Sequence, residues 1–380
     1  MTIRRGAHGI ACNVRYKVQA MAVLRNVGGL VVVFSSAMAL AQPETIEFRG
    51  AGACNASAAV ALDERRVIVG DDEQPWLSTF DVTTHALLEK KMIPFLEGGR
   101  EADIEGATIL RGQVIWITSH GRDGKGRVQE SRRMLFASHQ VAADGLATEL
   151  MTGPFRDFLS AVTAHPGDDP VFARLRASIG SSATDSNLAP KVNGFNIEGL
   201  TTSEGLVPRP ETPALLIGLR NPAAADGRAI LLELRNALDL LNGISAKVDL
   251  GRAILLNLGG RRIRDLAWSP HASAYLIIGG PAGDDANPFP DGNPPFTVFK
   301  WNGREDAAPV AVDGVGNPDS LDDFRPEAIV PLPTRKADNL VPSNRVLLLS
   351  DDGKRKINGT PCEKLPAGEQ FFRGIIRNVE

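Results

Sequence analysis

The sequence predicts an all-β fold, a β-propeller with five blades, or with six if further strands are hidden between the repeats. Two observations lead to this fold class. Five segments start with a polar residue, continue as a strand of small and apolar residues, and are followed by a second β-rich run that ends in a polar loop. A third β-rich run follows four of these loops. A unit of this kind that recurs along a chain is typical of propeller blades.

The first strand of each blade is expected to start at one of five polar residues. These are Ser57, Glu105, Glu198, Asp265 and Glu327. The second strands are expected over residues 66–70, 114–118, 214–218, 274–279 and 345–350. The third strands are expected over residues 77–82, 133–138, 229–234 and 296–301. The pattern does not locate a fourth strand.

The widest gap between repeat starts lies between Glu105 and Glu198, and it is about twice the length of an ordinary blade of ~40 to 50 residues. Within this gap, apolar residues over 154–179 recur at helical spacing. The sequence therefore predicts a helical insertion over about 151–195 rather than a sixth blade. A shorter helical piece is expected over 232–241.

Residues 1–41 have the composition of a secretory signal peptide. They carry five Lys and Arg residues and no Asp or Glu, then an apolar run, and they end in a small-x-small pattern from Ala39 to Ala41. The apolar run is shorter than the ~20 residues of a membrane-spanning helix. We therefore expect a periplasmic or secreted protein in which residues 42–380 form a single propeller domain. A buried N-terminal helix is the alternative.

The charge balance of the mature part is acidic. Of 42 Lys and Arg residues, five lie in the leader, so 37 remain against 45 Asp and Glu residues, a net charge of −8. An acidic surface without a basic run does not favour binding to a phosphate backbone, so nucleic acid is not expected as a partner. The mature part also has no apolar stretch long enough to span a membrane.

The two ends of the mature chain are expected to meet, because an open propeller would leave a strand edge unpaired. Residues 45–49 and 370–376 are both β-rich and could pair in one closing blade. The mature part has two cysteines, Cys54 near its beginning and Cys362 near its end. In an oxidising compartment such a pair favours a disulfide, which would join the closing seam, although two buried thiols are the alternative.

If the first strand of each blade lines the channel, its first residue and the loop after the second strand lie at the same end of the propeller. The first strands would bring metal-binding or ring-forming carboxylates to this mouth, from Glu105, Glu198, Asp265 and Glu327. The loops would add catalytic candidates, namely His120, Arg122 and Arg220. They would also add ligand-binding carboxylates, namely Asp71, Asp72, Asp351 and Asp352, together with Asp284.

Carboxylate oxygens at such a mouth suit a divalent cation, with Ca²⁺ favoured over Mg²⁺ with retained waters. His120 would act as general acid or base, and Arg122 and Arg220 would orient an anion. The structural alternative for the carboxylates is that they accept hydrogen bonds from backbone amides and hold the blades together. The structural alternative for the loop residues is that they are simply exposed.

Sequence motifs for a serine esterase, a zinc protease or a nucleotide-binding protein are absent, so no nucleotide cofactor is expected. The first functional hypothesis is a metal-assisted hydrolase or lyase that acts on a small anionic substrate. The alternatives are a non-catalytic module of the cell envelope that binds a ligand or a protein, and a purely structural interaction domain.

Several motifs occur in one order along the chain, including Glu101-Ala-Asp-Ile-Glu-Gly, Ser119-His-Gly-Arg, Asn196-Ile-Glu-Gly-Leu, Gly218-Leu-Arg-Asn-Pro and Leu349-Ser-Asp-Asp-Gly. This series, over about residues 50–375, resembles a family of exported bacterial proteins known as domain of unknown function 3616. The family implies no activity. More distantly, the Glu-Gly-Leu strand starts are similar to those of phytase-like and gluconolactonase-like propellers, a resemblance that implies divalent metals at channel carboxylates.

Overall fold

The computed structural model describes residues 45–96, 100–185, 187, 194–283, 291, 295–312 and 323–380. The expected signal peptide and Asp284 lie outside the described residues. No helix in the described part of the chain is long and apolar enough to cross a membrane.

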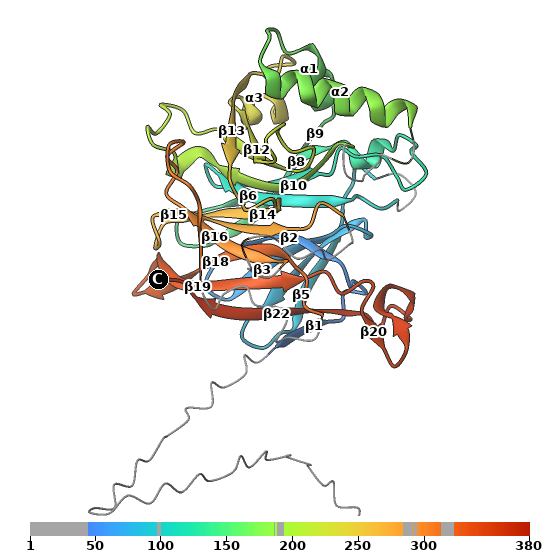
Figure 1. Cartoon of the computed structure of the whole chain (residues 1–380). Helices are drawn as coiled ribbons and strands as arrows, with labels where there is room; N and C mark the ends of the chain where they lie inside the picture. The colour runs from blue at the N-terminus through green and yellow to red at the C-terminus, as the bar shows by residue number, and fades with distance from the viewer. Residues whose placement is uncertain are drawn as a thin grey trace, which may run out of the picture. The chain divides into compact units, whose positions relative to one another are not determined.

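The described chain forms five four-stranded antiparallel sheets, which are the five blades of a β-propeller (Figure 1). Blades 1 and 2 contain β2 (Ala56–Ala61), β3 (Arg66–Asp71), β4 (Trp76–Asp81), β5 (Leu87–Met92), β6 (Ile104–Leu110), β7 (Gln113–Thr118), β8 (Leu135–Val141) and β9 (Ala147–Phe155). Blades 3 and 4 contain β10 (Asn196–Thr202), β11 (Leu215–Asn221), β12 (Ala229–Leu234), β13 (Leu250–Leu256), β14 (Arg262–Ser269), β15 (Ala274–Gly280), β16 (Thr297–Trp301) and β17 (Val310–Ala311). Blade 5 contains β18 (Pro326–Lys336), β19 (Asn339–Ser350), β22 (Phe371–Asn378) and β1 (Ile46–Arg49). The predicted fold class and blade number are confirmed.

The fourth strands were not located from the sequence because they lie at the outer edges of the blades. In β5 none of the six residues is fully buried, so the strand lacks the apolar pattern of a core strand. By contrast, all seven residues of the innermost strand β10 are buried, because neighbouring blades cover both of its faces.

The inner strands of adjacent blades approach one another closely, which explains the glycine that follows the strand-start glutamate in two blades. A Cβ atom on Gly106 would lie 2.8 Å from the Cβ atom of Leu200 in the next blade. A Cβ atom on Gly199 would lie 2.6 Å from Cδ2 of Leu266. Only glycine therefore allows these blades to pack at the observed separation.

Blade 5 closes the ring with strands from both ends of the propeller sequence, as expected. Strand β1 pairs antiparallel with β22, with Ile46 opposite Gly374 and Phe48 opposite Phe372. Next to this seam a disulfide joins Cys54 to Cys362, which are 308 residues apart in sequence. Closing so long a loop stabilises the fold by roughly 5 kcal/mol in the chain-entropy model, although measured bridges often contribute less.

The helices lie together beside blades 2 and 3 (Figure 1). They are α1 (Phe158–Ala164), α2 (Pro170–Thr184) and α3 (Ala237–Leu241), and their buried side chains join one hydrophobic cluster with the strands of these blades. The first two helices fall within the range of the predicted insertion, but residues 151–155 at its start belong to β9. Residues 232–234 of the shorter predicted helix belong to β12.

Candidate functional site

A β-bulge at the start of every inner strand builds a ring of side chains at one end of the propeller. In each blade the pairing of the first and second strands skips one residue, which leaves that residue without a partner. Such a bulge re-aims the side chain of the extra residue. The five extra residues, here called the bulge ring, are Ser57, Glu105, Glu198, Arg264 and Glu327.

The bulge ring surrounds a polar cavity of about 660 Å³, here called the acidic mouth. All five blades contribute to its lining, and four of the ring side chains face it. The lining includes eight acidic and four basic side chains, namely Asp72, Glu73, Glu105, Glu198, Asp323, Glu327, Asp351, Glu363, Arg220, Arg264, Arg325 and Lys354. The fifth ring residue, Ser57, instead donates a hydrogen bond to the carbonyl oxygen of Ile104 in the neighbouring blade.

Blade 4 contributes Arg264 to the ring, whereas the sequence suggested Asp265. The bulge lies between Ile263 and Asp265, so the side chain that it re-aims is that of Arg264. Asp265 is buried, and its Oδ2 accepts a hydrogen bond of 2.8 Å from the backbone N–H of Ile329 in blade 5. Asp265 therefore holds two blades together, which is the structural alternative for the strand-start carboxylates.

Arg264 joins two glutamates of the ring into a buried ion network. Its Nε lies 3.0 Å from Oε2 of Glu198, and its Nη2 contacts the carboxylate of Glu327. Glu198 also receives Nη1 of Arg220 at 2.7 Å and Nδ2 of Asn196 at 3.0 Å. Burial and the nearby charge of Arg220 lower the pKa of Arg264. The four charged side chains of this network, from Glu198, Glu327, Arg220 and Arg264, therefore each have an opposite charge beside them.

Three carboxylates with less compensation lie together at another part of the mouth, where Asp72 and Glu105 line the cavity and Asp103 lies behind them. Ligand atoms of Asp72, Asp103 and Glu105 all lie within 4.8 Å of one another, and we call these residues the carboxylate triad. Asp103 accepts a hydrogen bond from Oγ of Ser119, and its Oδ2 lies 3.0 Å from Nη1 of Arg132. Asp72 has one buried carboxylate oxygen, Oδ1, without a partner among the described residues.

Glu105 and Asp72 are the least compensated members of the triad. Glu105 is 9 % exposed, and among the described residues the carboxylates of Glu105 and Asp72 have neither a hydrogen bond nor an ion pair. An ionised carboxylate in such surroundings is unfavourable unless a proton or a cation joins it.

The pKa values of the triad reflect this shortage of positive charge. Burial, and then the charges of Glu198, Asp103 and Asp72, raise the pKa of Glu105 well above its usual value. Burial and the charge of Asp71 do the same for the pKa of Asp72. Burial raises the pKa of Asp103 to about 6, although Arg132 opposes the shift. Three carboxylates that resist simultaneous ionisation are well suited to share a divalent cation.

The loop carboxylates divide between the mouth and the protein interior. Asp72 and Asp351 line the mouth, as expected. Their neighbours point elsewhere, because successive side chains at a strand end alternate in direction. Asp71 accepts hydrogen bonds from the backbone N–H groups of Asn55 and Glu73, and burial raises its pKa to about 7. Asp352 forms a buried ion pair with Arg373 at 2.7 Å.

Two of the three catalytic candidates are not among the residues that line the mouth. His120 is 1 % exposed, its Nδ1 lies 2.9 Å from the carbonyl oxygen of Thr118, and its ring packs edge-on against Phe158 of α1. Burial lowers the pKa of His120 to about 4. Arg122 donates a hydrogen bond of 3.0 Å to the carbonyl oxygen of Gly126 within its own loop. Of these candidates only Arg220 reaches the mouth.

Sequence reasoning missed Asp103 and Arg264 as members of the site. Asp103 precedes β6 and has a positive φ of 54°, and Glu105 is the bulge residue, so strand alternation does not relate the two side chains and the sequence gives no signal for Asp103. Arg264 is the only basic residue of the bulge ring. The repeats were aligned by their acidic residues, and this alignment selected the neighbouring Asp265 instead. Finding it requires the position of the bulge, which depends on backbone pairing.

Comparison with known proteins supplies a similarity to a family but no activity. Residues 160–322, less than half of the chain, match a family model described as "Protein of unknown function (DUF3616)". The matched segment includes Glu198, Arg220 and Arg264 of the acidic mouth, and it is shorter than the resemblance expected over about 50–375. No curated protein matches this chain.

Among solved structures, this chain is similar to Myxococcus xanthus glutaminyl cyclase, with 11 % identity, 88 % of this chain and 96 % of that chain covered, and a TM-score of 0.38. It is similar to the Malassezia sympodialis allergen Mala s 1, with 8 % identity, coverage of 81 % and 78 %, and a TM-score of 0.37. It is also similar to the β-propeller domain of Myceliophteria thermophila Cps50 (Swd1), with 8 % identity, coverage of 89 % and 100 %, and a TM-score of 0.33.

Proposed function

We propose that this protein holds a divalent cation at Asp72, Asp103 and Glu105 and, through the cation, binds a small anionic ligand in the acidic mouth. The observation that carries the proposal is the carboxylate of Glu105, which is buried beside two other carboxylates without a partner of its own among the described residues. Hard oxygen ligands of this kind favour Ca²⁺, or Mg²⁺ with retained waters.

The charge of the acidic mouth explains why an anion would need the cation. Acidic side chains outnumber basic ones in the lining by eight to four, so a free anion would be repelled. Three of the basic side chains already have carboxylate partners, since Arg220 and Arg264 pair with Glu198, and Arg325 pairs with Asp323 at 3.0 Å. A cation at the carboxylate triad would add the positive charge that an anionic ligand requires.

The catalytic form of this proposal is a metal-assisted hydrolase or lyase. A bound divalent cation supplies Lewis-acid polarisation of a ligand oxygen. With the cation bound, its charge would hold Asp103 ionised as a ligand, so this carboxylate would position the metal rather than exchange a proton. The non-catalytic form, a ligand-binding or protein-binding module of the cell envelope, is favoured by the position of His120, which lies buried against Phe158 rather than in the lining of the mouth.

The first test is a thermal melt of residues 42–380 in EDTA, followed by addition of Ca²⁺, Mg²⁺, Mn²⁺ or Zn²⁺. A cation that binds only the folded state raises its stability, by about 2.7 kcal/mol when its concentration is 100 times Kd. We expect Ca²⁺ to raise Tm, and Glu105→Gln to abolish the rise. Glu363→Gln is the matched control, because Glu363 lines the same mouth outside the carboxylate triad. The proposal is wrong if no cation raises Tm, or if Glu105→Gln responds as the unchanged protein does.

A second test separates the two forms of the proposal. The protein with bound cation is screened against phosphate esters and lactones for turnover, and against phosphate and small carboxylates for binding. Turnover that disappears in Glu105→Gln supports the hydrolase or lyase. Anion binding that requires the cation, without turnover in any substrate class, supports the non-catalytic module.

We also propose that the protein is exported to the periplasm or secreted. The basic, acid-free leader supports export, and a disulfide between Cys54 and Cys362 is typical of oxidising compartments. Cell fractionation and N-terminal sequencing test this proposal. We expect a mature protein that starts at Gln42, and a full-length cytoplasmic product would contradict it.

A further inference from the structure

A second cavity, of about 350 Å³, lies at the opposite end of the same five inner strands. Each inner strand contributes residues two to six positions beyond its member of the bulge ring. Because a strand rises about 3.3 Å per residue, these positions lie well away from the acidic mouth. The two cavities share no lining residue among the described part of the chain. We call the second cavity the apolar mouth.

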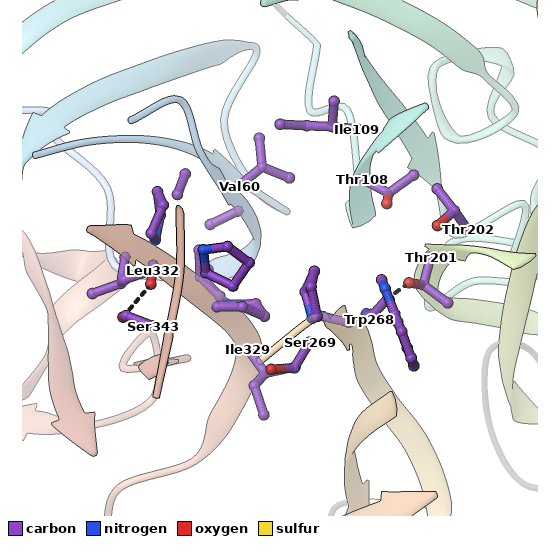
Figure 2. A pocket seen from close by; sticks show the side chains of 18 of the residues that line it. Val60, Thr108, Ile109, Thr201, Thr202, Trp268, Ser269, Ile329, Leu332 and Ser343 are labelled. Atoms are coloured by element: carbon purple, nitrogen blue, oxygen red, sulfur yellow. Dashed lines mark hydrogen bonds between the residues drawn. The ribbon is translucent and has the colours of Figure 1, made fainter. Parts of the chain in front are cut away.

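The lining of the apolar mouth is almost free of charge. Figure 2 shows Val60, Ile109, Ile329, Leu332 and Trp268 around the opening, together with hydroxyl side chains. Two of these hydroxyl groups have protein partners, since Oγ1 of Thr201 accepts from the backbone N–H of Trp268 and Oγ of Ser343 donates to the carbonyl oxygen of Leu332. A concave apolar surface with a few polar groups is the usual form of a small-molecule site.

One wall of the apolar mouth is an unusually long hairpin formed by β18 and β19. Beyond the blade, Pro333 pairs with Pro342, and Leu340 also lines the cavity. The hairpin is fixed at its tip by Arg335, whose Nε and Nη2 lie 2.8 and 3.0 Å from the two carboxylate oxygens of Glu64 in blade 1. The cavity is therefore already formed by the fold.

A single charged residue, Glu204, lines the apolar mouth within the described part of the chain. Its side chain is partly buried and has neither a hydrogen bond nor an ion pair with a described residue. The next residue, Gly205, packs directly on Trp268, since a Cβ atom on Gly205 would lie 2.2 Å from the indole ring. Glu204 therefore belongs to a segment that packs on one wall of the cavity, and both Glu204 and Trp268 line it.

We propose that the apolar mouth binds a small hydrophobic amine, with its apolar body against Val60, Ile329 and Leu332 and its ammonium group at Glu204. Glu204 supplies the opposite charge in a lining that is otherwise uncharged among the described residues. A carboxylate ligand would instead bring a second negative charge into a cavity that offers no cation among its described lining residues. This site is separate from the acidic mouth and does not depend on the cation proposed there.

The test uses three matched probes that differ only in their polar end: 4-phenylbutylamine, 4-phenylbutan-1-ol and 4-phenylbutyrate. Their binding to residues 42–380 is measured by titration calorimetry or ligand-observed NMR. We expect the amine to bind about tenfold more tightly than the alcohol, which corresponds to one charge-assisted contact, and the carboxylate to bind most weakly.

Three variants show whether the probes occupy this cavity. Glu204→Gln should weaken the amine to the level of the alcohol while the affinity of the alcohol stays unchanged. Thr108→Phe should block all three probes, because Thr108 faces the cavity (Figure 2). Glu105→Gln, in the acidic mouth, should leave amine binding unchanged both with Ca²⁺ and with EDTA, so that this site and the cation site are tested separately.

Amine binding no tighter than alcohol binding would overturn the proposal, as would a Glu204→Gln protein that keeps the preference for the amine. Failure of all three probes to bind at millimolar concentration would overturn it as well. If Thr108→Phe does not fold, the comparison of the unchanged protein with Glu204→Gln still decides the question, because that substitution keeps the size of the side chain.

Discussion

Replacing Arg264 by methionine should destabilise the protein strongly, because two buried carboxylates of the bulge ring would lose the cation between them. Arg264 and Glu198 are 7 % and 3 % exposed, and the same guanidinium contacts Glu327. Removing one partner from a buried ion network costs about 3 to 5 kcal/mol. For a domain of this size, with roughly 2.1 cal/mol/K of unfolding entropy per residue, that cost lowers Tm by about 4 to 7 °C.

The loss of stability should depend on pH. Without Arg264, the carboxylates of Glu198 and Glu327 would stay buried with one cation fewer beside them, which penalises their ionised forms in the folded state. The variant should therefore lose more stability at pH 8 than at pH 5. Reversible urea unfolding at the two pH values measures this difference.

The matched control for Arg264→Met is Arg304→Met, because Arg304 pairs with Asp306 at the surface, where both side chains are more than half exposed. Such a pair contributes about 0 to 1 kcal/mol. The reasoning would be refuted if Arg264→Met cost less than about 1 kcal/mol at pH 8, or if its cost were equal at pH 5 and pH 8. In either case the charges of the ring would be solvated rather than buried.

Glu105→Gln should make the cation-free protein more stable at pH 8, by about 1 to 2 kcal/mol. The reason is that burial raises the folded-state pKa of Glu105, so its ionised form is penalised above its unfolded pKa. Urea unfolding in EDTA measures the difference, and a less stable variant would contradict the prediction. Replacing Cys54 and Cys362 together by alanine should cost about 2 to 5 kcal/mol in the same assay, and an unchanged unfolding midpoint would show that the closing seam needs no bridge. Arg335→Ala should change global stability by about 1 kcal/mol or less, since its pair with Glu64 is partly exposed to solvent, while amide exchange in the β18–β19 hairpin becomes faster; equal exchange rates would show that this pair does not fix the hairpin.

The parts of the fold that could be predicted from sequence are those whose signal is local. The inner and second strands are buried on both faces and read as short apolar runs, so their number fixed the number of blades. The closing pair of β1 and β22 could also be inferred, because a propeller must satisfy its open edge. The outer strands could not be located, since β17 has two residues and β5 is largely exposed.

The candidate site was predicted in part for a similar reason. The position of each blade end could be inferred from the repeat, which brought Glu105, Glu198, Glu327 and Asp72 to one cavity. The direction of a single side chain could not, because it depends on a one-residue bulge. For that reason the sequence selected Asp265 where the ring contains Arg264. This difference changes the chemistry, since the basic residue neutralises one part of the mouth.

The bulge ring also explains how two unlike cavities can occupy the two ends of one channel. In four of the five blades, the bulge directs a charged side chain into the acidic mouth. The residues that follow the bulge in the same strand return to regular pairing with the second strand. There the blades pack so closely that Gly106 and Gly199 leave no room for a side chain. A few residues further, the strands open again into the apolar mouth. Because the packed layer lies between the two cavities, a substitution that alters the charge of the bulge ring leaves the shape of the apolar mouth intact, and each site can be tested with variants of its own.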